Sequence, residues 1–198
     1  MISITIAIFG DNNTGKTSLI NNFRDKKLLS NYETIGIENT SKIYRTKIQI
    51  FNCLWNNVEF LLNFKDVSER HFNFNKISNQ IKKEPTICLL MFDFGNRQSY
   101  YNMKKKLVIL KKKFGNSYFV LVGNKNDCLN KQITYHEAFQ FAEKNNLLFY
   151  QINNNNKNIY ILNTVLTQLY LDSFKKNIPE FKIIKKNNNC FFKFWNCF

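Results

Sequence analysis

The stretch GDNNTGKT, residues 10–17, constrains the fold of this chain more than any other feature. It matches the pattern G-x-x-x-x-G-K-[ST] and joins a β-branched run, ISITIAIF, to a segment of helical pattern. In that setting backbone N–H groups wrap the phosphates of a nucleotide, and the helix dipole attracts them. The pattern therefore predicts a phosphate-binding loop, here called the phosphate loop, between the first strand and the first helix.

Several side chains of the phosphate loop have expected roles. Lys16 would reach the β- and γ-phosphates, and the Thr17 hydroxyl would bind Mg²⁺. Asn13 stands where glycine is often needed, but asparagine tolerates a positive φ angle. The predicted nucleotide-binding residues of this segment are Gly10, Asp11, Asn12, Asn13, Thr14, Gly15, Lys16, Thr17 and Ser18.

Strand and helix patterns alternate along the chain. Helices are expected at 15–23, 99–114, 135–145 and 159–174, and strands at 2–9, 41–52, 56–64, 86–94, 117–127 and 147–152. This alternation predicts an α/β domain with a mostly parallel sheet. Ligands of such sheets bind where strands end and helices begin, which is where the phosphate loop lies.

A second candidate sequence, GNKND at residues 123–127, ends a buried strand. Asp127 can accept hydrogen bonds from N1–H and the exocyclic amine of guanine, a donor pair that adenine lacks. Asn124 can bond the base and brace the phosphate loop, and the Lys125 stem can cover the ring. Downstream of a phosphate loop, this sequence predicts a preference for GTP over ATP.

A third candidate, YETIGIE at residues 32–38, follows the first helix. Thr34 would supply a second hydroxyl to Mg²⁺ and a backbone N–H to the γ-phosphate. Because those contacts exist only with a triphosphate, the loop would act as an order–disorder switch.

These segments together resemble one protein family. GDNNTGKTSLINNF, TIGIE, MFDFGNRQSY and LVGNKND are similar in sequence and order to small GTPases of the Ras superfamily, most closely Rab, over roughly residues 3–175. The resemblance implies a P-loop NTPase fold, α/β, with a six-stranded, mostly parallel sheet flanked by helices. It also implies GTP/GDP and Mg²⁺ as ligands, and exchange proteins and effectors as partners of a monomeric switch in vesicle traffic.

The second switch motif departs from the family pattern. In the family the third strand ends in Trp-Asp-Thr-Ala-Gly-Gln-Glu-Arg, where Asp holds the Mg²⁺ shell, Gly contacts the γ-phosphate and Gln orients the attacking water. Aligning Glu69 and Arg70 with the family's Glu-Arg puts Phe64 at the Asp, Val67 at the Gly and Ser68 at the Gln.

A register shifted by one residue puts Asn63, Asp66 and Val67 at those three positions. Neither register restores the set, although a distorted loop would bring Asp66 towards the metal. No catalytic residue is therefore assigned, since Ser68 or Val67 replaces the water-orienting Gln. We expect a GTP-binding protein with weak or absent hydrolysis. The alternative is a non-catalytic, pseudo-GTPase scaffold that acts through partner binding.

The fifth family motif, Ser-Ala-Lys, aligns with residues 153–155. A backbone N–H to the guanine carbonyl survives such changes, so Asn154 is expected in the nucleotide site. The complete set beyond the phosphate loop is thus Thr34, Asn124, Lys125, Asp127 and Asn154, with Thr17 and Thr34 as metal ligands.

Charge and cysteine usage limit the partners. The formal charge of +15 suggests an anionic partner, but only four of the 29 basic residues are arginine, so nucleic acid is not expected. The five cysteines include no Cys-x-x-Cys pair, which argues against structural zinc and favours the cytoplasm.

We expect a GTPase domain over residues 1–178 and a basic, aromatic tail over 179–198. Lysines beside phenylalanines and tryptophan suit an anionic membrane surface, which predicts peripheral attachment to the cytosolic face of an endomembrane. Cys197 is a candidate for lipidation, although no C-a-a-X arrangement is present. The alternative is that these aromatic side chains pack on the domain or in a partner's groove.

Overall fold

The computed structural model describes residues 2–23, 37–50, 54–67, 81, 84–153, 161 and 164–169, with the backbone alone for 2, 37–50 and 54–60. The chain divides into two compact units, Met1–Thr164 and Val165–Phe198. Of the helix expected at 159–174, residues 161 and 164–169 are helical and the others lie outside the described residues. No helix of the described part has the length and hydropathy needed to cross a bilayer.

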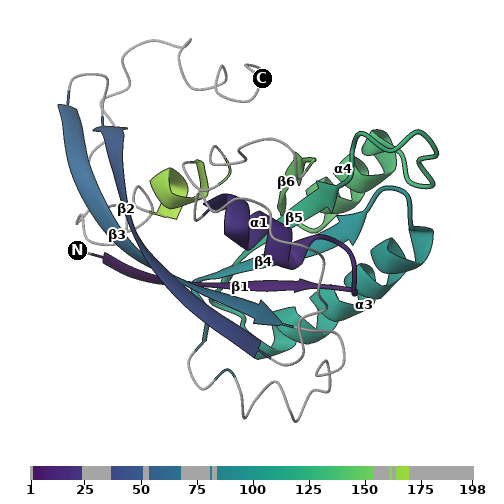
Figure 1. The fold of residues 1–198 in the computed structure, drawn as a ribbon, viewed down its shortest axis with the longest axis horizontal. Helices are drawn as coiled ribbons and strands as arrows, with labels where there is room; N and C mark the ends of the chain where they lie inside the picture. The colour runs from purple at the N-terminus through teal and green to yellow at the C-terminus, as the bar shows by residue number, and fades with distance from the viewer. Residues whose placement is uncertain are drawn as a thin grey trace. The chain divides into compact units, whose positions relative to one another are not determined.

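The first unit is built on a six-stranded sheet in the order β2-β3-β1-β4-β5-β6 (Figure 1). Five strands run parallel, and β2 pairs antiparallel with β3. This confirms the predicted α/β fold with a mostly parallel sheet. The strands are β1 (Ile2–Gly10), β2 (Ile37–Ile50), β3 (Leu54–Val67), β4 (Ile87–Asp93), β5 (Tyr118–Asn124) and β6 (Leu148–Gln151).

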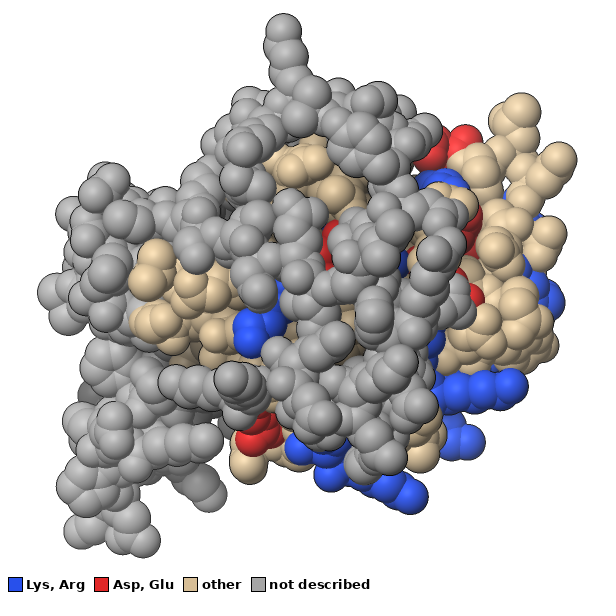
Figure 2. Space-filling model, turned by 60° about the horizontal axis from the view of Figure 1, so that its bottom comes forward, with Lys and Arg blue, Asp and Glu red and all other residues tan. Residues whose placement is uncertain are grey.

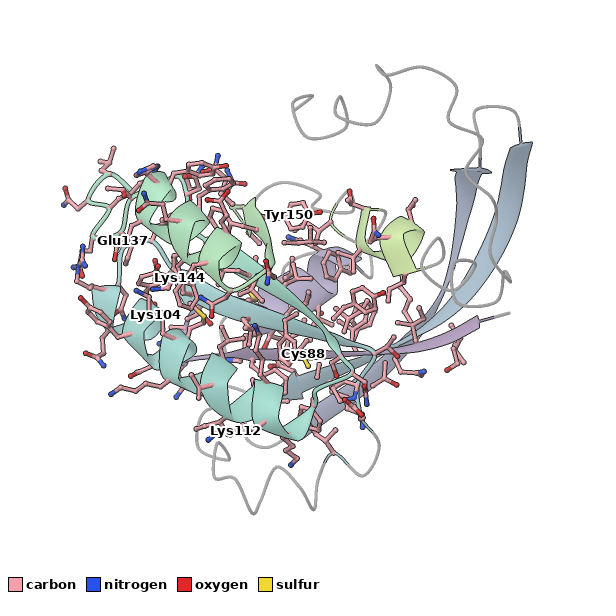
Figure 3. The ribbon with its side chains drawn as sticks, turned by 180° about the vertical axis from the view of Figure 1, so that it is seen from behind. Cys88, Lys104, Lys112, Glu137, Lys144 and Tyr150 are labelled. Carbon is pink, nitrogen blue, oxygen red and sulfur yellow. The ribbon has the colours of Figure 1, made fainter. Side chains whose placement is uncertain are left out.

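Helices cover both faces of the sheet. Helix α1 (Lys16–Phe23) lies in front of the sheet in Figure 1, where the Phe23 ring stacks on Phe64 of β3 at 5.8 Å between centroids. Helices α3 (Arg97–Lys113) and α4 (Tyr135–Lys144) cover the opposite face, which is turned to the viewer in Figure 3. Each begins with a side-chain cap, Asn96 for α3 and Thr134 for α4, which satisfies an otherwise unpaired backbone N–H.

Strand β3 is longer than the sequence predicts, because it continues past Phe64 to Val67. Asp66 is aligned with Ile8 of β1 on one side and with Glu38 of β2 on the other. β1 pairs with β3 as far as Asp66 and β2 as far as Val67, so the ladder does not stop at residue 64. Asp66 and Val67 are therefore strand residues and not part of a following loop.

The thiol of Cys88, the second residue of β4, is fully buried in the interior and is labelled in Figure 3. Burial disfavours the thiolate and raises the pKa of Cys88 from its ordinary value of 9.0 to about 12. Between those values only the unfolded chain loses the proton, so the free energy of unfolding falls as the pH rises, by up to about 1.4 kcal/mol per unit. Below pH 9 this contribution is fully present.

Urea unfolding at pH 8 and pH 10 checks this expectation. Wild-type protein is expected to lose about 1 kcal/mol more stability over that interval than a Cys88→Ala variant, which lacks the titrating thiol. Equal losses in the two proteins would contradict the assignment.

Candidate nucleotide-binding site

The phosphate loop connects the end of β1 to the start of α1 through a backbone that only some residues can adopt. Asn13 and Gly15 have positive φ angles of 60° and 94°, which confirms that asparagine serves here in place of glycine. Gly10 is required for space, because a Cβ atom there would lie 2.6 Å from the Met91 carbonyl oxygen. The Thr14 hydroxyl closes the loop by donating to the Asp11 carbonyl at 2.8 Å.

Lys16, at the start of α1, folds back over the phosphate loop. Its buried ammonium group donates to the carbonyl oxygens of Gly10 at 3.0 Å and Asp11 at 2.9 Å. These carbonyls hold a charged group that the interior would otherwise disfavour. The same ammonium is thereby kept at the loop that the sequence predicts to wrap phosphate.

The side chain facing Thr17 is Asp66, and this corrects the alignment made from sequence. The Thr17 hydroxyl donates to Asp66 Oδ2 at 2.5 Å, and Asp66 is fully buried at the end of β3. Phe64 packs under α1, and Asn63 Nδ2 donates to the Ser3 hydroxyl at 3.2 Å. The Asp of the family pattern therefore corresponds to Asp66 and to neither Phe64 nor Asn63.

The physical reason for the error is a change in length. With Asp66 at the family's Asp and Arg70 at its Arg, five residues stand where the family has seven. An alignment without a gap, anchored on Glu69 and Arg70, consequently places every upstream position two residues too early. The shortened part is the one that would hold the family's glycine and glutamine.

Val67 cannot take the place of either missing residue. It is 2% exposed and belongs to the apolar cluster under α3, with Phe9 and Phe92 among its members. Successive strand residues point to opposite faces of a sheet, so Val67 faces away from the side on which Asp66 meets Thr17. Its apolar side chain can neither donate to nor accept from a water molecule at the phosphate loop.

The Thr17 hydroxyl and Asp66 carboxylate suit a hard cation. Mg²⁺ prefers oxygen ligands and is usually bound by one or two carboxylates together with phosphates and water. No group of three or more histidine, cysteine, aspartate or glutamate side chains gathers among the described residues. The two oxygen-bearing side chains thus fit a magnesium ion shared with a nucleotide and do not fit a metal held by protein alone.

Asn124, the last residue of β5, joins the GNKND segment to the phosphate loop. Its side chain is fully buried, and Nδ2 donates to the Thr14 carbonyl at 2.8 Å. Its other polar atom, Oδ1, is buried with no hydrogen-bond partner in the described part of the chain. The predicted bracing role is present, and one acceptor remains for a ligand.

The two charged residues after Asn124 are held differently. Lys125 has a φ angle of 58°, and its ammonium forms a 2.6 Å ion pair with Asp93 at the end of β4. Asp127 is exposed and makes no hydrogen bond or ion pair with the residues that the structure describes. Its carboxylate is therefore open to a ligand.

Sequence reasoning missed Asp93, although an aspartate at the end of a buried strand was a usable signal. Its Oδ1 accepts from the Gly95 N–H at 2.8 Å, so Asp93 holds the turn after β4 while Oδ2 holds Lys125. Four predicted positions, Thr34, Ser68, Asn154 and Cys197, lie outside the described residues, as does the tail over 179–198.

Replacing Asn124 with alanine should loosen the phosphate loop. The change leaves the buried Thr14 carbonyl without its donor, so we expect the free energy of unfolding to fall by about 1–3 kcal/mol. Denaturant unfolding of nucleotide-free protein measures this loss. Asn116→Ala, at an exposed position, is the matched control and should change the free energy by less than about 0.5 kcal/mol. A loss in Asn124→Ala as small as that of the control would show that the brace is unimportant.

Comparison with known proteins gives a consistent result. The chain is 30% identical over 146 residues to Ras-related protein Rab-2B of Dictyostelium discoideum, a stretch that spans 72% of this chain and 67% of that protein. It is 29% identical over 151 residues to Ras-related protein Rab-4A of Homo sapiens and of Rattus norvegicus, covering 72% of this chain and 62% of each relative. A sequence model of the Ras family matches residues 5–171, and the chain belongs to that family.

Proposed function

We propose that this chain is a Rab-like guanine-nucleotide switch that binds GTP and GDP with Mg²⁺ and hydrolyses GTP slowly. The observation that carries the proposal is the 2.8 Å hydrogen bond from Asn124 to the Thr14 carbonyl, because it brings the GNKND segment beside the phosphate loop. The exposed Asp127 and the buried acceptor of Asn124 then favour a ligand with several N–H donors on its base edge.

Each residue of the site has a defined task in nucleotide binding. Lys16 would exchange its bonds to the Gly10 and Asp11 carbonyls for phosphate oxygens, and the phosphate-loop backbone would supply N–H donors. Thr17 and Asp66 would hold Mg²⁺, which neutralises charge on the β- and γ-phosphates when bound. Asp127 would select guanine.

Slow hydrolysis follows from the residues after Asp66. Phosphoryl transfer in this class of enzyme depends mainly on the positioning of the attacking water and on electrostatics. The buried Val67 offers no polar group for that water, and the segment that would carry the family's glutamine is shorter. We therefore infer that the triphosphate state persists unless a partner protein supplies the missing group.

The shortened segment also favours a second candidate function. A pseudo-GTPase scaffold would retain guanine nucleotide without turnover and act through partner binding alone. The two functions differ only in whether bound GTP is ever cleaved, so a single-turnover measurement separates them.

We further propose a role in vesicle traffic, on the cytosolic face of an endomembrane. The relatives named Rab support this proposal, as does a tail that combines lysines with phenylalanines and tryptophan. Effectors and exchange proteins would then be its partners, and Cys197 would be available for lipidation.

Denaturing the purified protein and identifying the released nucleotide tests the proposed ligand. Guanine nucleotide at a near-stoichiometric level is the expected result. Adenine nucleotide would instead indicate a different P-loop enzyme and would overturn the proposal.

A further inference from the structure

One lysine of α3 is buried in a helix whose other lysines are more accessible to solvent. The helix carries six lysines and no acidic residue, and Lys112 for example lies on its outer side (Figure 3). Lys106 is only 5% exposed, whereas Lys105, Lys111 and Lys112 of the same helix are exposed, and Figure 2 shows other lysine and arginine side chains reaching into solvent. A lysine is rarely buried unless it is paired. Its burial therefore needs a partner in the interior.

That partner is Asp11, the second residue of the phosphate loop. Lys106 Nζ forms an ion pair with Asp11 Oδ1, and Asn102 Nδ2, one helical turn earlier, donates to Asp11 Oδ2 at 2.6 Å. Both carboxylate oxygens of Asp11 are thus held from α3. The Asp11 side chain is 12% exposed and that of Lys106 is 7% exposed, so water screens the pair little.

We propose that Lys106 and Asn102 are positioning residues that fix the phosphate loop through Asp11 and neutralise its carboxylate for the arrival of a phosphate group. This inference rests on the proposed binding of a guanine nucleotide at that loop. It assigns to α3 a role in nucleotide retention that neither the family match nor the loop sequence supplies.

The backbone of Asp11 transmits this restraint to the rest of the loop. Its carbonyl oxygen accepts from the Thr14 hydroxyl at 2.8 Å and from Lys16 Nζ at 2.9 Å. Displacement of Asp11 would consequently disturb both the turn of the loop and the ammonium that contacts phosphate.

Helix α3 is firmly placed and can act as the fixed support. Tyr100, Met103 and Leu107 bury one of its faces against the sheet, and Lys104 Nζ lies 4.1 Å from the centroid of the Tyr100 ring. At its start, Arg97 donates to the Gln132 carbonyl at 2.6 Å and pairs with Glu137 of α4 at 3.4 Å. Lys104 and Glu137 are both labelled in Figure 3.

Lys106 also changes the charge of the phosphate loop. A carboxylate in a phosphate-binding loop repels the ligand, and the repulsion grows with each added phosphate. The ion pair with Lys106 neutralises the negative charge of the Asp11 carboxylate. Removing only the lysine would leave a buried, unpaired carboxylate, which costs far more than removing both partners.

The test uses the full chain loaded with a fluorescent GDP analogue, whose release is followed after addition of excess unlabelled GDP in Mg²⁺ buffer. Lys106→Met is expected to release the analogue at least about tenfold faster than wild type. Asp11→Asn in the same background removes the stranded charge and should return the rate to within about threefold of wild type. Lys105→Met, which changes an exposed neighbour, is the matched control and should leave the rate unchanged.

The same variants separate positioning from simple structural support. Lys106→Met should weaken binding of a non-hydrolysable GTP analogue more than binding of GDP, because the extra phosphate adds charge. A variant with a lower melting temperature but a release rate within about twofold of wild type would overturn the inference. If Lys106→Met does not fold, Asn102→Ala in the same assay should release about threefold faster, and an unchanged rate overturns the inference equally. Wild-type protein that retains no guanine nucleotide would instead refute the proposed function on which the inference rests.

Discussion

Replacement of Asp127 with asparagine is expected to weaken GDP binding by about 10⁴-fold, the largest effect of any single change in the site. In the proposed site the carboxylate would accept from two N–H groups of guanine, whereas an amide offers one acceptor and sets its own donor against the other N–H group. Xanthine carries a carbonyl where guanine carries its amine, so the variant should bind xanthosine diphosphate better than GDP. Equilibrium titration with fluorescent analogues of both nucleotides measures this exchange of preference.

A second carboxylate-to-amide change controls for charge. Glu143→Gln alters an exposed residue of α4 by the same chemistry and should leave both affinities unchanged. Asp127→Asn protein that binds GDP as tightly as wild type would mean that Asp127 does not contact the base.

Replacement of Asp66 with asparagine should abolish most of the effect of Mg²⁺ on nucleotide retention. The amide keeps the shape of the side chain and can still accept from the Thr17 hydroxyl, but it lacks the negative charge that favours the ion. We expect Mg²⁺ to slow GDP release by wild type, and the slowing to shrink by about 10–100-fold in the variant. Release rates measured in Mg²⁺ and in excess EDTA give this ratio for each protein.

The control for this experiment also tests the strand register. Asn63→Ala changes the residue that one ungapped alignment places at the metal, and the structure places Asn63 beside Ser3 instead. Mg²⁺ should slow GDP release by the Asn63→Ala variant as much as it slows release by wild type. If Mg²⁺ no longer slowed GDP release by Asn63→Ala but still slowed release by Asp66→Asn, the residue at the metal would be Asn63 and not Asp66.

The parts of the site that follow a strand directly could be predicted from sequence. The phosphate loop and GNKND each come at the end of a β-branched or apolar run, and parallel strands bring such ends to one edge of the sheet. This local logic was enough to foresee that Asn124 braces the loop and that Asn13 adopts a positive φ angle.

The position of Asp66 could not be predicted, because it depends on pairing between distant segments. The length of β3 is set by the pairing of Asp66 with β1 and β2 and of Val67 with β2, and nothing within the stretch itself marks residue 64 or 67 as its end. Because two residues are missing after Asp66, an alignment without a gap matches the family's Asp to Phe64 or Asn63 instead. Only an alignment with a two-residue gap after Asp66 matches Asp66 to the family's Asp and also matches Glu69 and Arg70 to its Glu-Arg.

The pairing of Asp11 with Lys106 escaped prediction for a similar reason. The two residues are 95 positions apart, and Lys106 is one of six lysines in a helix that lacks acidic residues. Lysines in such a run are normally solvated. Only the packing of α3 against β1 and β4 shows which of them faces inward.

We propose that this chain holds GTP beside Thr17 and Asp66, and that no residue at the end of β3 replaces the glutamine that orients the attacking water in the family. The most direct test of this claim is a single-turnover measurement of bound GTP in the presence and absence of Mg²⁺, with human Rab-4A measured in parallel. We predict guanine nucleotide that remains bound and is cleaved about a hundredfold more slowly than on the relative. Cleavage at the rate of the relative would contradict the claim.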